Sequence, residues 1–153
     1  MTPDQIALVQ RSFAELEASE PGFSRCFYKR LFQLDTSLRV LFQGDSAAQG
    51  ARLMQMLKLA VGALARTEAL APTLRSLGAR HQGYGVRHYD FETLAQALND
   101  SLRNRLGKRF DTALEEAWSL AYTLIANEMR RGMAGGDTEA AAWTPRRAVD
   151  VSL

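Results

Sequence analysis

Residues 77–86 read Leu77-Gly78-Ala79-Arg80-His81-Gln82-Gly83-Tyr84-Gly85-Val86. A helical segment that carries a histidine runs here into a pair of glycines, and helices commonly end at glycine. Near a helix end, a neutral imidazole can present one ring nitrogen to a metal while the other donates to a carbonyl of the preceding turn. A lone histidine is more often a structural residue, so its role depends on the rest of the chain.

The segments on both sides of this stretch have the pattern of helices. The chain is poor in Val and Ile and rich in Ala, Leu, Arg and Glu, and it lacks the alternation that is typical of strands. Apolar residues recur instead at helical spacing. We therefore expect an all-α protein with helices over about 3–18, 23–32, 35–42, 49–66, 72–83, 90–106 and 111–131.

Local signals set several of these helix starts. Thr2-Pro3-Asp4-Gln5 has the residue types of a capping box, with proline at the first helical position. Pro72 is expected to open a shorter helix for the same reason, and Asp90 to cap the next one. His88 is then expected at the solvated start of that helix.

Length and composition restrict the function classes. The 153 residues suit one domain, and 19 Lys and Arg against 17 Asp and Glu leave a formal charge of +2, too balanced for a nucleic-acid role. The single cysteine, Cys26, excludes an internal disulfide and a multi-thiolate metal site. No leader and no long apolar run is evident, so we expect a cytoplasmic protein that does not engage a membrane. Residues 1–131 are the expected domain, and 132–153 a flexible tail.

Several catalytic classes lack their motifs. The chain has no G-x-S-x-G, no phosphate-binding glycine loop, no paired Glu-x-x-His and no C-x-x-C-H. Its only histidines are His81 and His88, so metal or acid–base chemistry must involve one of them or carboxylates.

Five pieces of the sequence resemble the globin family when taken together. They are the run from Phe27 through Phe32, Leu41-Phe42, the run from Gln49 through Leu53, residues 77–86, and Trp118-x-x-x-Tyr122, with 32 positions from Gln49 to His81. The resemblance covers about residues 3–131. It is strongest to bacterial single-domain globins, among them the Hell's Gate type, to flavohaemoglobin globin domains and to neuroglobins. It implies a three-over-three helical sandwich enclosing non-covalent haem b.

The resemblance also implies roles for individual residues. His81 would be the proximal ligand of the haem iron, and Tyr28 and Gln49 would face the ligand on the distal side. Haem would also contact a mostly apolar set: Phe42, Phe27, Leu53, Leu57, Leu77, Tyr84, Val86, Phe91, Leu94, Tyr122 and, at a propionate, Arg52. Without the resemblance, the better interpretation of Tyr28 is a core tyrosine bonded to a carbonyl, and that of Gln49 is an exposed first-turn residue.

Two hydrogen-bond donors on the distal side would stabilise a bound ligand that gains charge from the iron, as O2 does. If each contributes about 1–2 kcal/mol, O2 dissociation slows by roughly one to three orders of magnitude. We therefore expect a protein that binds O2 reversibly with high affinity, with NO and CO as further ligands. The alternatives are a nitric oxide dioxygenase or nitrite reductase that uses an external reductase, since the length leaves no room for flavin and nicotinamide domains, and a haem-free signalling scaffold. A monomer or weak dimer is expected.

Overall fold

The computed structural model describes residues 1–42 and 44–133, and these are helical and without strands. The α-helices are α1 (Pro3–Ala18), α2 (Gly22–Leu34), α3 (Ser46–Gly62), α4 (Thr67–Gly83), α5 (Asp90–Leu106) and α6 (Thr112–Arg131). Short 3₁₀ helices lie between them: η1 (Thr36–Leu41), η2 (Leu64–Arg66) and η3 (Gly107–Arg109). The all-α expectation is confirmed. Of the expected tail, residues 134–153 lie outside the described residues.

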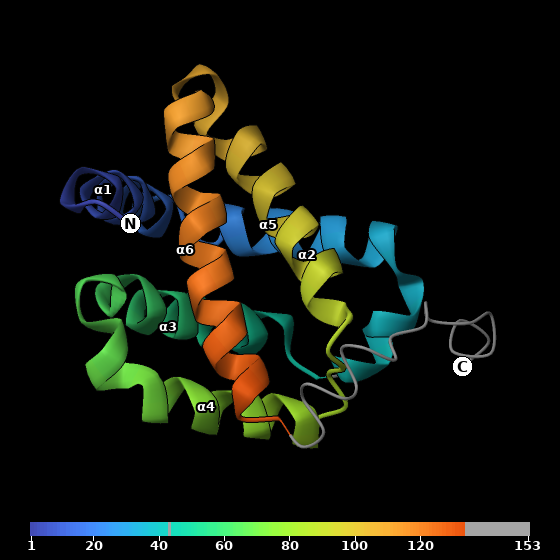
Figure 1. The fold of residues 1–153 in the computed structure, drawn as a ribbon. Coiled ribbons are helices and arrows are strands. Elements are labelled where there is room, and N and C mark those ends of the chain that lie inside the picture. The colour runs from blue at the N-terminus through green and yellow to red at the C-terminus, as the bar shows by residue number, and fades with distance from the viewer. Residues whose placement is uncertain (43, 134–153) are drawn as a thin grey trace.

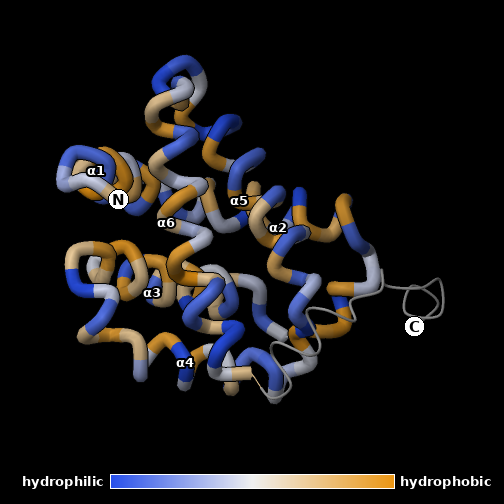
Figure 2. The backbone as a smooth tube through the Cα atoms, viewed as in Figure 1, coloured by the Kyte–Doolittle hydropathy of each residue, from blue (hydrophilic) through white to orange (hydrophobic). Residues whose placement is uncertain are grey.

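The helices pack at steep angles around α6. In Figure 1, α6 runs down the front of the molecule with α5 beside it, and α3 and α4 cross behind it. The largest contacts join α2 to α5 and α4 to α6, and α1 also packs on α6. Figure 2 shows hydrophobic and hydrophilic residues alternating along the helices, as expected where each helix buries one stripe.

Side-chain hydrogen bonds cap the first turns of α1 and α6. The Thr2 hydroxyl accepts from Gln5 N at 3.1 Å, and the Gln5 side chain accepts from Thr2 N at 2.9 Å, which is the reciprocal bonding that the sequence predicts. At α6, the Asp111 carboxylate accepts from Leu114 N at 2.9 Å. These bonds satisfy amides that would otherwise lack a partner at the first turn.

The expected helix start at Pro72 is wrong. Pro72 lies inside α4, which begins at Thr67 directly after η2. The proline lacks the N–H that would bond the carbonyl of Glu68. Glu68 is exposed, so water can reach that carbonyl, and the helix continues through the proline.

The start of α5 also differs from expectation. Tyr89 occupies the cap position, and Asp90 is the first helical residue, with its carboxylate accepting from Arg87 N at 2.9 Å. His88 is 2% exposed rather than solvated. It is buried because this connection packs against α6, where Arg130 donates to the His88 carbonyl at 3.5 Å.

Within the described ranges, no helix combines the length and the apolar character that a membrane span requires.

Candidate functional site

His81 lies in the last turn of α4, and one of its ring nitrogens contacts a main-chain oxygen. Its Nδ1 is 2.7 Å from the main-chain oxygen of Leu77, one turn earlier. A carbonyl oxygen can only accept, so in the neutral imidazole Nδ1 carries the proton and Nε2 keeps its lone pair. The tautomer and ring orientation of a metal-binding histidine are set in this way.

The glycines after His81 reverse the chain. Gly85 has φ +97°, a conformation that L side chains rarely adopt, and a Cβ there would lie 2.9 Å from Leu41 Cδ2. The turn is closed by Val86 N, which donates to the His81 carbonyl at 3.0 Å. Gly85 therefore lets Val86 return toward the core beside the histidine.

Tyr28 and Gln49 are brought together from α2 and α3. The Tyr28 hydroxyl donates to the main-chain oxygen of Gln49 at 3.3 Å. Gln49 stands in the first turn of α3, yet it is only 7% exposed, so the structure does not place it on the surface. The carbonyl bond of Tyr28 is the contact that the core-tyrosine interpretation anticipates.

An aromatic group surrounds Tyr28. Its ring centroid lies 5.3 Å from that of Phe27, 6.0 Å from Phe32 and 5.2 Å from Phe42. These rings belong to a larger packed cluster, here called the distal cluster. Its expected site residues are Phe27, Tyr28, Phe42, Leu53, Leu57 and Leu94.

A second group of expected site residues packs near the end of α6. This proximal cluster contains Leu77, Val86, Phe91 and Tyr122, together with the buried Met129 and Met133. Leu41 packs against both clusters. The apolar residues expected around the cofactor thus form two groups that meet at one side chain.

Two expected residues lie at the surface. Tyr84 is 69% exposed, with its ring centroid 6.5 Å from that of His81. Arg52 is also exposed, on α3 one turn after Gln49. Its charge acts on the phenol of Tyr28, which places it beside the distal cluster.

Two partly buried phenols, those of Tyr28 and Tyr122, are held neutral. Burial raises the pKa of Tyr28 to about 12, against the opposing charge of Arg52. Burial likewise raises the pKa of Tyr122 above its usual range, with Arg130 acting in the opposite direction. The Tyr122 hydroxyl donates to the Phe91 carbonyl. Each phenol therefore remains a hydrogen-bond donor at neutral pH.

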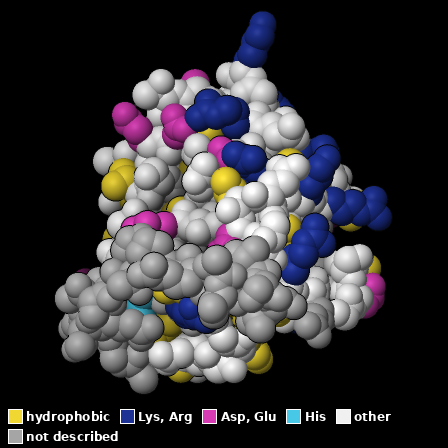
Figure 3. Space-filling view, turned by 90° about the vertical axis from the view of Figure 1, so that its right-hand side faces the viewer, with side chains coloured by type: hydrophobic (Ala, Val, Ile, Leu, Met, Phe, Trp, Pro, Cys, Tyr) yellow, Lys and Arg dark blue, Asp and Glu magenta, His cyan; other side chains and the backbone are white. Residues whose placement is uncertain are grey.

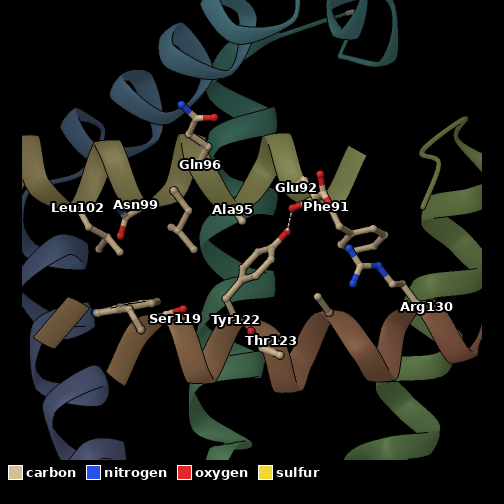
Figure 4. Close-up of a pocket in the computed structure, with 13 residues that line it drawn as sticks. Phe91, Glu92, Ala95, Gln96, Asn99, Leu102, Ser119, Tyr122, Thr123 and Arg130 are labelled. Carbon is tan, nitrogen blue, oxygen red and sulfur yellow. Dashed lines mark hydrogen bonds between the residues drawn. The ribbon is translucent and has the colours of Figure 1, made fainter. Parts of the chain in front are cut away.

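A groove of about 420 Å³ lies between α5 and α6 (Figure 4). Phe91 and Tyr122 line it, but His81, Tyr28 and Gln49 do not. Arg130, at one end, stacks 5.1 Å from the Phe91 ring centroid. Arg130 is not among the residues expected from the sequence, because its contact with Phe91 joins two different helices.

The residues present fit a haem. A haem iron takes an imidazole nitrogen as its axial ligand, and His81 offers Nε2 with Nδ1 already bonded. Apolar and aromatic side chains, which a porphyrin needs on both faces, are supplied by the distal and proximal clusters.

Comparison with known proteins gives a consistent result. The sequence profile of the family described as Globin matches residues 25–129. Neuroglobin from Danio rerio is 27% identical over 141 residues, covering 83% of this chain and 89% of that protein. A flavohemoprotein from Chromobacterium violaceum is 28% identical over 152 residues, covering 92% of this chain but 37% of that longer protein. Among solved structures, an engineered carbene transferase from Rhodothermus marinus superposes with a TM-score of 0.76 at 21% identity, covering 92% of this chain and 99% of that one.

Proposed function

The chain belongs to the globin family, and on this premise we propose that it holds haem b non-covalently and binds O2 reversibly with high affinity. NO and CO are the other ligands of this proposal. The observation that carries it is the 2.7 Å contact between His81 Nδ1 and the Leu77 carbonyl. It leaves Nε2 as the nitrogen that would hold the iron.

When bound, haem supplies a ferrous iron that takes up diatomic ligands. The work of this chain is to hold His81 in one tautomer, to exclude water and to present donors. Phe27 and Leu53 are 5% and 8% exposed and would form the dry wall of the ligand side. Tyr28 keeps its proton because burial raises its pKa to about 12.

The donor pair supports high affinity. O2 gains negative charge when it binds, whereas CO gains little, so a donor facing the ligand stabilises O2 more. With about 1–2 kcal/mol from each of Tyr28 and Gln49, O2 would leave roughly ten to a thousand times more slowly than from an apolar pocket.

The test is the visible spectrum of the haem-loaded full-length chain, first as the ferrous protein and then with O2. We expect a five-coordinate ferrous spectrum that changes on adding O2 and reverts when O2 is removed. His81→Ala should lose the five-coordinate histidine spectrum. The Tyr28→Phe, Gln49→Leu double variant should still take up haem but release O2 at least about tenfold faster.

Leu59→Ala is the matched control, since Leu59 is 41% exposed and outside both clusters. It should leave the spectrum and the O2 release rate unchanged. Failure of the wild-type chain to take up haem would overturn the proposal and favour a haem-free scaffold. A six-coordinate ferrous spectrum without added ligand would overturn the assignment of Gln49.

A second candidate is nitric oxide dioxygenation or nitrite reduction with electrons from a separate reductase. It is favoured by the match to a flavohemoprotein, which extends over 92% of this chain. The measurement is NO consumption and nitrate formation over many turnovers, with and without a flavin-dependent reductase. Turnover that requires the reductase and falls in the Tyr28→Phe variant supports this candidate, and a single turnover in both conditions contradicts it.

A further inference from the structure

The charges of this chain are unevenly distributed along its sequence. Residues 46–89, which form α3, η2, α4 and the connection to α5, contain one acidic residue, Glu68, and six basic ones: Arg52, Lys58, Arg66, Arg75, Arg80 and Arg87. Their formal charge is +5, whereas the rest of the chain, with 13 basic and 16 acidic residues, has a formal charge of −3. The positive charge is therefore concentrated on the segment that carries Gln49 and His81.

Two of the six cations are paired with carboxylates of other helices. Arg75 Nε lies 3.1 Å from a carboxylate oxygen of Glu128 on α6, and Lys58 Nζ lies 3.5 Å from one of Glu17 on α1. These two cations are therefore already balanced within the fold.

Three exposed cations of the segment lack this balance. Arg52, Arg66 and Arg80 form no ion pair with any residue that the structure describes. The helices α5 and α6, by contrast, carry acidic and basic residues together, and Figure 3 shows side chains of both signs as neighbours on the upper part of the face that it draws. An excess of one sign attracts a partner of the opposite sign and speeds its association.

Tyr84 projects from the carboxyl-terminal end of α4. Among the large apolar side chains that the structure describes it is the most exposed, at 69%. Its N–H donates to the Arg80 carbonyl at 3.1 Å, which holds its backbone, and its ring centroid lies 6.5 Å from that of His81. Arg80 and Tyr84 stand four residues apart, so their side chains adjoin on one face. Tyrosine and arginine are the residue types that most often dominate binding at protein interfaces.

The other exposed residues of α4 after its first turn are mostly small. Together with Arg80 and Tyr84 they are here called the α4 surface, and they are Pro72, Thr73, Ser76, Ala79 and Gly83. In Figure 1, α4 forms the lower edge of the molecule, so a large partner can reach this surface. Small side chains let a protein approach the helix closely, whereas a lipid surface favours several projecting apolar groups.

We propose that the α4 surface docks an acidic electron-carrier protein, which the positive charge of residues 46–89 guides to it. The proposal rests on the proposed function, because it concerns the supply of electrons to a haem held by His81. One electron would pass from the partner's reduced centre to ferric iron, with no bond made or broken. Tyr84 favours this point of contact because it is both exposed and close to His81. The two propionates of a haem would lower the charge of the segment but leave it positive.

The first test is the binding of a plant-type ferredoxin, an acidic iron–sulfur protein, to the haem-loaded full-length chain. We expect saturable binding that weakens at least about tenfold between ~0.02 and ~0.2 M salt, because salt screens exposed charges. Arg80→Glu should weaken it at least about tenfold, and Tyr84→Ala at least about fivefold.

Lys108→Glu is the matched control. Lys108 is exposed and makes no ion pair with a described residue, and it lies in η3, between α5 and α6, which Figure 1 draws at the top, far from α4. The variant changes the net charge by the same amount as Arg80→Glu, yet it should alter the dissociation constant by less than about threefold. Equal effects of the two variants would overturn the proposal, because net charge alone would then explain binding.

The second readout is the rate at which reduced ferredoxin converts the ferric to the ferrous spectrum under CO without O2. We expect Arg80→Glu and Tyr84→Ala to slow this reduction in step with their loss of affinity, and Lys108→Glu to leave it unchanged. The ferric spectrum of each variant, recorded first, separates lost docking from lost haem.

The outcomes distinguish this proposal from the proposed function. A chain that takes up no haem contradicts the proposed function. A normal haem spectrum without salt-dependent ferredoxin binding overturns the docking proposal alone. Tighter binding to vesicles that contain one quarter anionic phospholipid than to ferredoxin would identify a lipid surface and would likewise overturn it.

Discussion

The Tyr28 hydroxyl lies 3.3 Å from the Gln49 main-chain oxygen, whereas O–H donors usually lie about 2.7–2.8 Å from their acceptors. A bond this long is weak. Under the proposed function, the phenol would exchange it for a shorter bond to a ligand at little cost. Gln49, whose main-chain oxygen accepts this bond, lies beside Tyr28.

The Tyr28 phenol should ionise at a higher pH than an exposed tyrosine. Burial raises its pKa to about 12, so the folded state keeps the phenol neutral while the unfolded chain ionises near pH 10. The contribution of this group to stability is fully present below pH 10 and is lost as the pH rises toward 12. A phenolate absorbance titration checks this: Tyr28→Phe should remove one group from the titration near pH 12 and none near pH 10. Loss of a group near pH 10 instead would contradict the buried environment.

The Gln49→His variant tests the prediction that the wild type has no titrating group on the distal side. An imidazole at this position can ligate iron or gain a proton near neutral pH, and an amide does neither. We expect the haem-loaded variant to show a six-coordinate ferrous spectrum and an autoxidation rate that rises steeply near pH 6. The wild type should show a shallower pH dependence. An equally steep profile in both proteins would argue against the role of Gln49.

At the scale of helices, α4 and α6 cross at backbone contact. A Cβ on Gly78 would lie 1.8 Å from the Met129 carbonyl oxygen, and one on Gly132 would lie 1.8 Å from that of Arg75. Gly78 lies within α4 and Gly132 directly follows the last residue of α6, so a glycine from each side lies at the crossing. Because Gly78 precedes His81 by one turn, this close approach also sets the position of the candidate iron ligand.

Gly78→Ala should therefore destabilise the fold. The added methyl meets backbone, which cannot move aside cheaply, so we expect the free energy of unfolding to fall by about 3 kcal/mol. Gly62→Ala is the control, because a Cβ there meets nothing within 4 Å. It should be neutral or stabilising by up to about 1 kcal/mol. Denaturant unfolding of the two variants measures both effects, and equal stabilities would contradict the tight crossing.

At the scale of the whole molecule, the distal and proximal clusters share Leu41, which is only half-buried. Both clusters also border the central core, because Leu57 of the distal cluster and Tyr122 of the proximal cluster pack against it. A haem that contacts both clusters would add stability that the chain lacks without it.

Haem should accordingly stabilise the fold by mass action. At a free haem concentration 100 times its dissociation constant, the free energy of unfolding should rise by about 2.7 kcal/mol. His81→Ala should lose part of this gain at the same concentration, because its affinity is lower. Denaturant unfolding with and without haem provides the measurement. Identical curves for the wild type in both conditions would contradict haem binding in the core.

Much of the helical layout follows from local sequence. The capping box at Thr2 acts within one turn, so residue type and spacing were sufficient to predict it. The resemblance carried by five pieces of the sequence likewise led to the globin family, because it rests on an order of residues and intervals that can be read along the chain.

Burial and close approach depended on how the helices pack. Nothing near His88 in sequence indicates that Arg130 lies against its backbone, and the proline rule at Pro72 gave way to a helix already started at Thr67. The burial of Gln49, the glycine crossing of α4 and α6 and the α5–α6 groove have the same origin. Caps and periodicity arise from interactions within a helix, whereas burial is set by contacts between residues far apart in the chain, which only the packed structure specifies.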